Sequence, residues 1–233
     1  KVVLHCAGPF AHTWRPMAEA CLRTGTHYLD ITGEPLVFES LHARDAEARA
    51  ASVMLLPGAG FDVVPSDCLA AHLKRRLPTA RRLGLAFRAL GGVSRGTAAT
   101  VVENLGQGGL VRRGGVLTQV PAGWKTRLID FGRGPTRTVT IPWGDVVTAF
   151  YSTGIPDIEV YAAVRGPSWA IRCLGPLFRT RPVQAFLKSR IRGRPPGPTD
   201  EERARGRGLL GGEAVDEAGR TVAPGEEGEV RVG

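Results

Sequence analysis

The sequence predicts an α/β fold: part of a parallel sheet, followed by an α+β region whose sheet is mostly antiparallel. Two observations lead to this prediction. Within the first 78 residues, three short apolar runs alternate with three helical patterns, which is the order of βαβ units. After Pro78 the chain changes to short β-type runs separated by glycine and proline, as is typical of antiparallel strands.

The first region contains three predicted strand–helix pairs. Its strands are apolar runs without clean alternation, as expected where helices cover both faces of a parallel sheet. Gly25 ends the first helix, and Pro78 closes the third. The strands are expected at residues 1–6, 27–31 and 52–56, and the helices at residues 15–23, 36–51 and 66–77.

The later region mixes both kinds of element. Alternating and β-branched runs predict strands at residues 83–90, 116–120, 125–131, 136–141 and 158–164. Helical spacing predicts helices at residues 96–105, 144–151 and 169–191. Residues 194–198 (RPPGP) are expected to form a stiff linker, and residues 209–232 contain two strand-like pieces around turns.

Charge favours anionic partners. The chain has 31 Lys and Arg against 22 Asp and Glu, a net charge of +9, which suits nucleotide phosphates, nucleic acid or an anionic membrane face. Many basic residues lie between Arg172 and Arg207, as either a solvated face or a contact for anionic lipid or phosphate. No helix-turn-helix, RRM or zinc pattern accompanies the charge, so we expect no nucleic-acid partner.

Cysteine and histidine usage points away from metals and disulfides. The four cysteines have no metal-ligand spacing, and the five histidines form no HExxH or Cys/His cluster. We therefore expect no metal site and reduced thiols in a cytoplasmic protein. No apolar run is long enough to span a bilayer, so any membrane association would be peripheral.

The segment from Gly58 to Val63 (GAGFDV) follows a predicted strand and precedes a helix, as a dinucleotide-binding loop does. Val63 stands where close helix–strand packing requires Gly or Ala, and no acid ends a following strand at the expected distance. A tight loop at a strand end is the alternative, and such a loop can still line a ligand crevice.

Two other turns lie at predicted strand ends, where open α/β sheets bind ligands. Residues 6–10 (CAGPF) offer small residues that let a ligand approach the backbone, and Phe10 for packing against a flat ring. A purely structural turn fits equally well. In residues 32–34 (TGE), Glu34 could accept hydrogen bonds from a carboxamide or ribose, or simply cap the following helix.

Polar groups in the second region suit a substrate. They are the motifs at residues 94–97 (SRGT) and 143–145 (WGD), which pair an Arg with an Asp. Such a pair can orient a carbonyl or carboxylate, although a surface ion pair is the simpler reading.

Taken together, these segments resemble the saccharopine dehydrogenase-like oxidoreductases, enoyl reductases of this type included. The matching pieces occur in family order over roughly residues 1–222. They are residues 2–10 (VVLHCAGPF), 20–34 (ACLRTGTHYLDITGE), 58–67 (GAGFDVVPSD), 94–103 (SRGTAATVVE), 142–161 (PWGDVVTAFYSTGIPDIEVY) and 195–206 (PPGPTDEERARG).

The resemblance implies three parts: residues 1–78 as the C-terminal half of a Rossmann-type dinucleotide-binding domain, residues 79–193 as an α+β substrate and dimerisation domain, and residues 194–233 as a linker with C-terminal strands. It implies NAD or NADP as cofactor, with NADP favoured, and hydride transfer to or from a carbonyl, imine or enoyl group of a small or lipid-like substrate. A homodimer is left open.

The resemblance also implies site residues. The cofactor would lie against Cys6, Ala7, Gly8, Pro9, Phe10, Gly33, Glu34, Gly60, Phe61 and Asp62. The substrate would face Ser94, Arg95, Thr97, Trp143, Asp145 and Thr153.

Two departures from the family pattern qualify these expectations. The family's first strand and GxxGxxG loop have no counterpart in this sequence, and the pattern after residue 222 also differs. Because the loop amides and helix dipole neutralise the diphosphate, we expect this chain alone to bind cofactor weakly and regard it as a truncated member. The alternative is a non-catalytic, membrane- or lipid-associated scaffold that uses the basic segment from Arg172 to Arg194.

Overall fold

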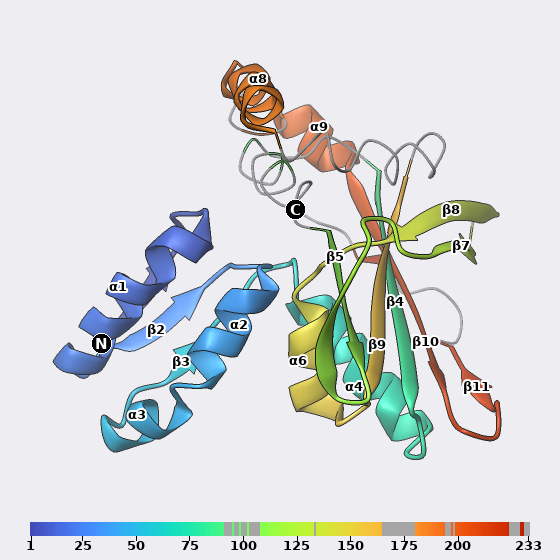
Figure 1. The fold of residues 1–233 in the computed structure, drawn as a ribbon, viewed down its shortest axis with the longest axis horizontal. Helices are drawn as coiled ribbons and strands as arrows, with labels where there is room; N and C mark the ends of the chain where they lie inside the picture. The colour runs from blue at the N-terminus through green and yellow to red at the C-terminus, as the bar shows by residue number, and fades with distance from the viewer. Residues whose placement is uncertain are drawn as a thin grey trace.

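Two sheets organise the chain in the computed structural model (Figure 1): a three-stranded sheet in the order β1-β2-β3 and a nine-stranded sheet. Both are followed through the residues that the structure describes, which are 1–90, 95, 98, 102, 108–132, 134–164, 180–193, 197, 199–223 and 229–230.

The small sheet is parallel, as predicted. β1 (Val2–His5) pairs with β2 (His27–Asp30), and β2 pairs with β3 (Leu55–Leu56), in both cases in the same direction. Helices α1 (Phe10–Thr24) and α2 (Pro35–His42) bury Tyr28, among other side chains, in one core. All three strands therefore end at one edge, which is the ligand edge of such sheets.

Two helices of this region differ from the prediction. α1 begins at Phe10 rather than at residue 15, directly after the turn. The helix predicted over residues 36–51 is divided into α2 and α3 (Asp45–Ala50). Asp45 and Glu47 occupy the first turn of α3, where acidic side chains favour a new helix start because they face its positive dipole end.

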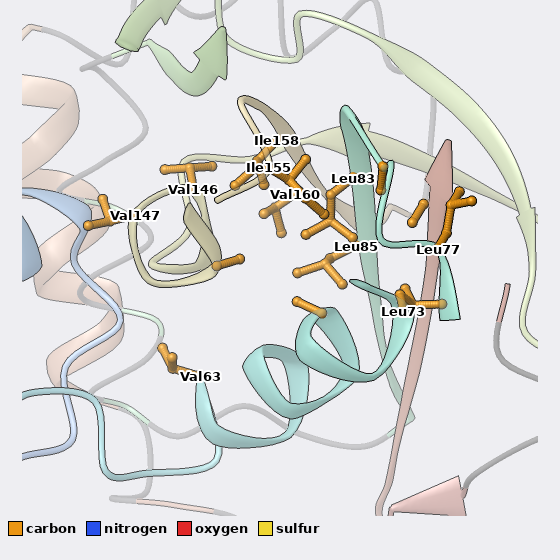
Figure 2. Packing of buried hydrophobic residues seen from close by; sticks show 14 of the residues in the cluster. Val63, Leu73, Leu77, Leu83, Leu85, Val146, Val147, Ile155, Ile158 and Val160 are labelled. Atoms are coloured by element: carbon orange, nitrogen blue, oxygen red, sulfur yellow. The ribbon is translucent and has the colours of Figure 1, made fainter. Parts of the chain in front are cut away.

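Helices α4 (Val64–Arg76) and α6 (Asp145–Thr153) lie between the small sheet and the large one (Figure 1). They pack on one face of the large sheet and build the main core with Leu83 and Leu85 of β4 (Figure 2). Gly212 of β10 lets α4 approach closely, since a Cβ there would lie 3.1 Å from Leu69, Leu73 and Leu85. Through α4 and α6, the large sheet is thus connected to the edge of the small sheet at which β1, β2 and β3 end.

The large sheet is mostly antiparallel, as predicted. Among its described strands, β4 and β9 form the one parallel pair. Its strands are β4 (Arg82–Leu90), β5 (Gly109–Arg113), β6 (Val116–Val120), β7 (Thr126–Asp130), β8 (Pro135–Thr140), β9 (Asp157–Ala163), β10 (Arg207–Val215), β11 (Thr221–Val222) and β12 (Glu229–Val230).

Several elements of the second region were not predicted. β5 and the helix α9 (Asp200–Arg205) are absent from the prediction, although Thr199 and Glu202 form a capping box that signals the α9 start. β10 pairs with β4 along its whole length. The helix predicted over residues 96–105 lies largely outside the described residues, and of the one predicted over 169–191 the structure describes α8 (Arg181–Arg192).

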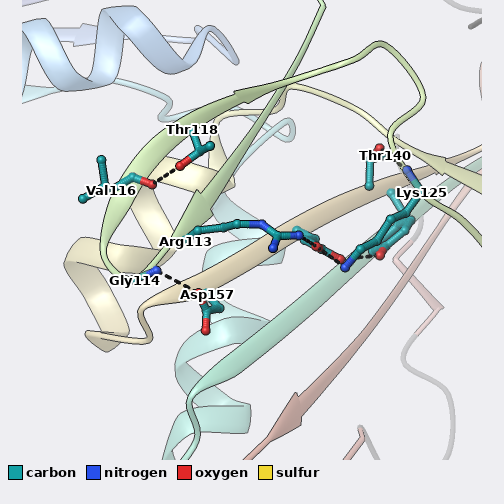
Figure 3. Close-up of polar contacts among 9 residues, drawn as sticks. Arg113, Gly114, Val116, Thr118, Lys125, Thr140 and Asp157 are labelled. Carbon is teal, nitrogen blue, oxygen red and sulfur yellow. Dashed lines mark hydrogen bonds and ion pairs between the residues drawn. The ribbon is translucent and has the colours of Figure 1, made fainter.

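A charged cluster connects β5, β7, β9 and their loops on the large sheet (Figure 3). Glu159 accepts hydrogen bonds from Lys125 Nζ (2.5 Å) and Arg113 Nη2 (3.3 Å) on one oxygen, and from the Tyr161 hydroxyl (2.6 Å) on the other. Burial raises the pKa of Glu159, but the bonds from Lys125 and Tyr161 outweigh it, so the net pKa is lowered.

Within this cluster we expect unequal effects from two substitutions. Lys125→Met should lower the free energy of unfolding by less than about 1 kcal/mol, because the Lys125 side chain is 44% exposed. Glu159→Leu should cost about 1–3 kcal/mol, because it leaves the hydroxyl of buried Tyr161 without this acceptor. Urea denaturation of both variants measures this, and a larger loss for Lys125→Met would contradict it.

Candidate functional site

A buried carboxylate, Asp30, organises the ligand edge. Its side chain is fully buried at the end of β2. One oxygen accepts the backbone amides of Thr32 (3.0 Å) and Gly58 (2.8 Å), and the other accepts the Tyr28 hydroxyl (2.7 Å). Since both strand-end loops bind the same carboxylate, they are held side by side. The sequence analysis missed Asp30, although an acid that ends an apolar strand is a recognisable signal.

Glu34 attaches the third loop to the same edge. Its carboxylate oxygens accept the backbone amides of Phe10 and Ala11, each at 2.8 Å. A negative charge at this position also complements the positive end of the α1 dipole. The side chain thus caps α1 and not the helix that follows it. Consequently the turns at residues 7–10 and at Gly33 lie on one rim, as the parallel-sheet hypothesis requires.

In the turn after β1 the backbone is exposed, but the aromatic ring of Phe10 is buried. Cys6, Ala7 and Gly8 are exposed, so a ligand can reach their main chain. The Phe10 ring is 9% exposed and packs edge-on against His5, with 5.4 Å between the ring centroids. The Phe10 ring is therefore not available to stack on a flat ligand, contrary to the expectation from the sequence. Pro9 beside it is half-buried.

Gly33, Asp62 and Trp143 meet at the centre of the edge. The Trp143 indole N–H donates to the Asp62 carbonyl at 2.7 Å. A Cβ placed on Gly33 would lie 3.6 Å from the Asp62 side chain and 3.9 Å from the Trp143 ring. The two regions therefore contribute to one site: Gly33 and Asp62 come from the predicted cofactor set, and Trp143 from the predicted substrate set.

Glycine is needed at two positions beside this site. Gly58 has φ +70°, and a Cβ there would lie 2.6 Å from the Phe38 ring. A Cβ on Gly144 would meet the same ring at 2.6 Å. The Gly58–Val63 segment is therefore a tight loop whose first amides are occupied: Gly58 donates to the Asp30 carboxylate and Ala59 to its carbonyl (2.7 Å). Within it, Gly60 packs on Ile31, and the Phe61 ring is 42% exposed.

Asp145 lies directly behind Trp143 and Gly144, at the start of α6. Its side chain is fully buried. Burial raises the pKa of Asp145 to about 8, and the nearby Asp67 and Asp62 carboxylates add to this rise, which Ser66 partly offsets. Burial also raises the pKa of Asp62 and of Asp67. Of these three carboxyls, Asp145 can therefore be held as a neutral carboxylic acid at neutral pH, where an exposed aspartate would be ionised.

The remaining predicted substrate residues are not gathered here. Thr153 is at the opposite end of α6, about 12 Å along the helix from Asp145, and its hydroxyl donates to the Ala149 carbonyl. Arg95 is exposed. Ser94 and Thr97 lie outside the described residues.

An arginine that the sequence analysis did not single out joins the two regions. The Arg112 side chain is 4% exposed and donates to Glu39 of α2 (2.6 Å), to the Val146 carbonyl (2.7 Å) and to the Gly115 carbonyl (2.7 Å). Its guanidinium also lies 4.2 Å from the Phe150 ring centroid. These contacts hold α6, and with it Trp143, against the small sheet.

In the described part of the chain, no group of three or more His, Cys, Asp or Glu is arranged to hold a metal ion. The three described cysteines, Cys6, Cys21 and Cys68, are free thiols. None of the described helices combines the length and apolarity needed to cross a bilayer.

Comparison with known proteins finds the same family that the sequence motifs indicate. Over 68 residues it is 40% identical to a saccharopine dehydrogenase-like oxidoreductase of Mus musculus, covering 29% of this chain and 16% of that protein. Over 80 residues it is 41% identical to a trans-acting enoyl reductase of Mycobacterium leprae, covering 33% and 19%. No protein-family model matches the chain. The resemblance inferred from the motifs is thereby confirmed, over segments that span less than a fifth of these relatives.

A solved structure shares the fold. Saccharopine dehydrogenase (L-Glu forming) from Saccharomyces cerevisiae superposes with a TM-score of 0.55 at 10% sequence identity, covering 95% of this chain and 68% of that one. At this identity the likeness concerns the fold alone. It confirms the predicted α/β architecture with a small parallel sheet and a larger mixed sheet.

Proposed function

We propose that this chain is part of an NAD(P)-dependent oxidoreductase that transfers a hydride to or from a carbonyl, imine or enoyl substrate. One observation carries the proposal: the three parallel strand ends and the Trp143 segment of the second region converge on Gly33 and Asp62. Strand-end crevices of this kind bind nucleotides in open α/β sheets. The names of the relatives, oxidoreductase and enoyl reductase, support the same class.

The edge suits the nicotinamide end of such a cofactor better than its diphosphate. The backbone at Ala7, Gly8 and Gly33 has no bulky side chain, so a flat ring can approach it. The amides at the start of α1 and at Gly58 and Ala59 already bind Glu34 and Asp30, so they leave no cradle for phosphate. When bound, the cofactor supplies hydride chemistry; the chain's own residues orient the ring and exclude water.

The substrate end of the site is proposed to be Asp62 and Trp143. Reduction of a carbonyl or imine leaves an oxygen or nitrogen that must take up one proton, and Asp62 is a half-buried carboxyl with a raised pKa at this position. Trp143 holds the Asp62 main chain through its indole N–H, and its ring lies 3.9 Å from the position of a Cβ on Gly33. The favoured cofactor remains NADP.

Amide NMR titration with NADPH, NADH and nicotinamide mononucleotide tests this proposal. We expect shift changes confined to Ala7, Gly8, Gly33 and the Gly60–Asp62 loop, even if the affinity of this chain is only millimolar. Gly33→Val should abolish them by filling the crevice, whereas Gly193→Val, at an open helix end, should not. Shifts that survive Gly33→Val, or none at any concentration, would contradict the proposal.

A second candidate, the lipid-associated scaffold, is favoured by one observation on α8. Phe186 is 61% exposed there, and the guanidinium of exposed Arg190 lies 5.9 Å from its ring centroid, with Arg192 also exposed on the same helix. An aromatic side chain among cations suits an anionic lipid surface. Cosedimentation with phosphatidylserine vesicles tests it: salt-sensitive binding that Phe186→Ala weakens would support the scaffold, and absence of binding would exclude it.

A further inference from the structure

Helices α2 and α6 leave the ligand edge side by side (Figure 1). At the edge, a Cβ on Gly144, the residue before α6, would lie 2.6 Å from the Phe38 ring of α2 and 3.3 Å from the Gly33 carbonyl. At the other end of the pair, the His42 and Tyr151 rings stack with 3.6 Å between their centroids. The two helices therefore run in the same direction and touch at both ends.

Each helix carries one side of the proposed crevice at its start. α2 begins at Pro35, two residues after Gly33, and α6 begins at Asp145, two residues after Trp143. A Cβ on Gly33 would lie 3.9 Å from the Trp143 ring. Because helices behave as rigid elements, the spacing of α2 and α6 sets the separation of Gly33 and Trp143.

A single carboxylate of α2, that of Glu39, binds both the second region and α6 itself. One of its oxygens accepts the Arg112 guanidinium at 2.6 Å, and the other accepts the Tyr151 hydroxyl at 2.9 Å. Burial and the bond to Glu39 raise the pKa of the Tyr151 hydroxyl, so this group stays protonated and acts as the donor. Hydrogen bonds to a charged group are shorter and stronger than those between neutral groups, so Glu39 can hold the two helices at a defined spacing.

Arg112 connects this carboxylate to the first turn of α6. Its Nε donates to the Val146 carbonyl at 2.7 Å, and the Val146 amide donates to the Trp143 carbonyl at 3.1 Å. The Asp145 side chain provides no other attachment, because it is fully buried and neither of its oxygens has a hydrogen-bond partner among the described residues. Every step from Glu39 to Trp143 is therefore a direct hydrogen bond.

We propose that Glu39 is a positioning residue that fixes the separation of Gly33 and Trp143 in the proposed oxidoreductase site. It acts through Arg112 and α6 and touches no ligand itself. The inference rests on the proposed function: a ring bound against Gly33 would be bordered by Trp143, so their separation decides how the ring is oriented. A shift of about 1 Å in a positioned group can cost about 100-fold in rate.

Nuclear Overhauser effects in the full 233-residue chain test this inference without cofactor. In the wild type, cross-peaks should connect the Trp143 ring with the Gly33 α protons and with the ring of Phe87, whose centroid lies 5.8 Å from that of Trp143. Phe87 belongs to β4 and does not depend on α2. In Glu39→Ala, the cross-peak with Gly33 should be lost and the one with Phe87 kept.

Two further variants and a control complete the test. Glu39→Gln keeps an acceptor oxygen for Arg112 and should retain both cross-peaks. Tyr151→Phe removes only the hydroxyl bond and should weaken the cross-peak with Gly33 alone. Glu47→Ala is the control, because the Glu47 carboxylate pairs with Arg44 outside α2 and α6, and it should change neither cross-peak.

An unchanged cross-peak with Gly33 in folded Glu39→Ala would overturn the proposal, and so would loss of both cross-peaks in the folded variant, which would mean a general role in stability. If Glu39→Ala does not fold, an unchanged cross-peak with Gly33 in Tyr151→Phe overturns it instead. These readouts need no nicotinamide, so their failure is distinguishable from failure of the NMR titration with NADPH.

Discussion

Replacing Asp30 by alanine is expected to lower the free energy of unfolding by about 3–5 kcal/mol, among the largest effects of a single substitution in this chain. The substitution leaves three buried hydrogen-bond donors without their acceptor. These donors are the amides of Thr32 and Gly58 and the hydroxyl of Tyr28. An unsatisfied buried donor costs about 1–3 kcal/mol, and donors that lose a charged acceptor cost most.

Tyr28→Phe measures the part of this loss in stability that comes from the tyrosine hydroxyl. It removes one of the three hydrogen bonds and leaves the carboxylate with its two amides, so we expect a loss of only about 1–2 kcal/mol. Asp45→Ala is the matched control, because its carboxylate pairs with Arg49 at the surface and should contribute less than about 1 kcal/mol. Guanidinium denaturation measures all three, and equal losses for Asp30→Ala and Asp45→Ala would refute the role given to Asp30.

Loss of Asp30 should also disorder the ligand edge. Its carboxylate joins the loops after β2 and β3, so the alanine variant should lose hydrogen-exchange protection at Gly58 and Ala59 before the rest of the sheet. Proton-exchange NMR below the denaturation midpoint measures this directly.

Arg112→Met is the second large prediction, with an expected loss of about 3 kcal/mol. The substitution leaves the carbonyls of Val146 and Gly115 without this donor and removes the cation from the Phe150 ring. Removing one partner of a buried ion pair costs about 3–5 kcal/mol. We take the lower end because Glu39 is 32% exposed and water can replace part of its bond.

Arg113 provides the control for this prediction. It is adjacent in sequence and also pairs with a glutamate, but its side chain is 47% exposed, so Arg113→Met should cost less than about 1 kcal/mol. Thermal denaturation of the two variants measures the contrast. A double-mutant cycle with Glu39→Gln should give a coupling of about 1 kcal/mol or more; no coupling would mean that Arg112 acts through the carbonyls alone.

The parallel sheet could be predicted because its signals are local. The apolar runs around Leu4, Leu29 and Leu55 alternate with helical spacing, and each βαβ unit is encoded by neighbouring residues. The same holds for most strands of the second region. β5 was missed because Arg112, a buried charge, interrupts its apolar pattern, and only its distant partners make that charge acceptable.

The site could be predicted in parts but not assembled. The turns at residues 6–10 and 32–34, the Gly58–Asp62 loop and the segment around Trp143 were recognised as motifs. Their mutual contacts depend on Asp30, Glu34 and the Trp143–Asp62 bond, which connect residues 23 to 81 positions apart. Whether the Phe10 ring is free or buried likewise depends on His5 and the surrounding core.

By itself, then, the sequence determined the α/β class, the parallel order of the first three strands and the motifs that line their ends, since periodicity and turn chemistry act between near neighbours. Tertiary structure alone decided the pairing of β10 with β4, the burial of Asp145 without a partner and the meeting of Gly33, Asp62 and Trp143. These features arise from packing between segments far apart in the chain, and no local pattern encodes the environment that such packing creates.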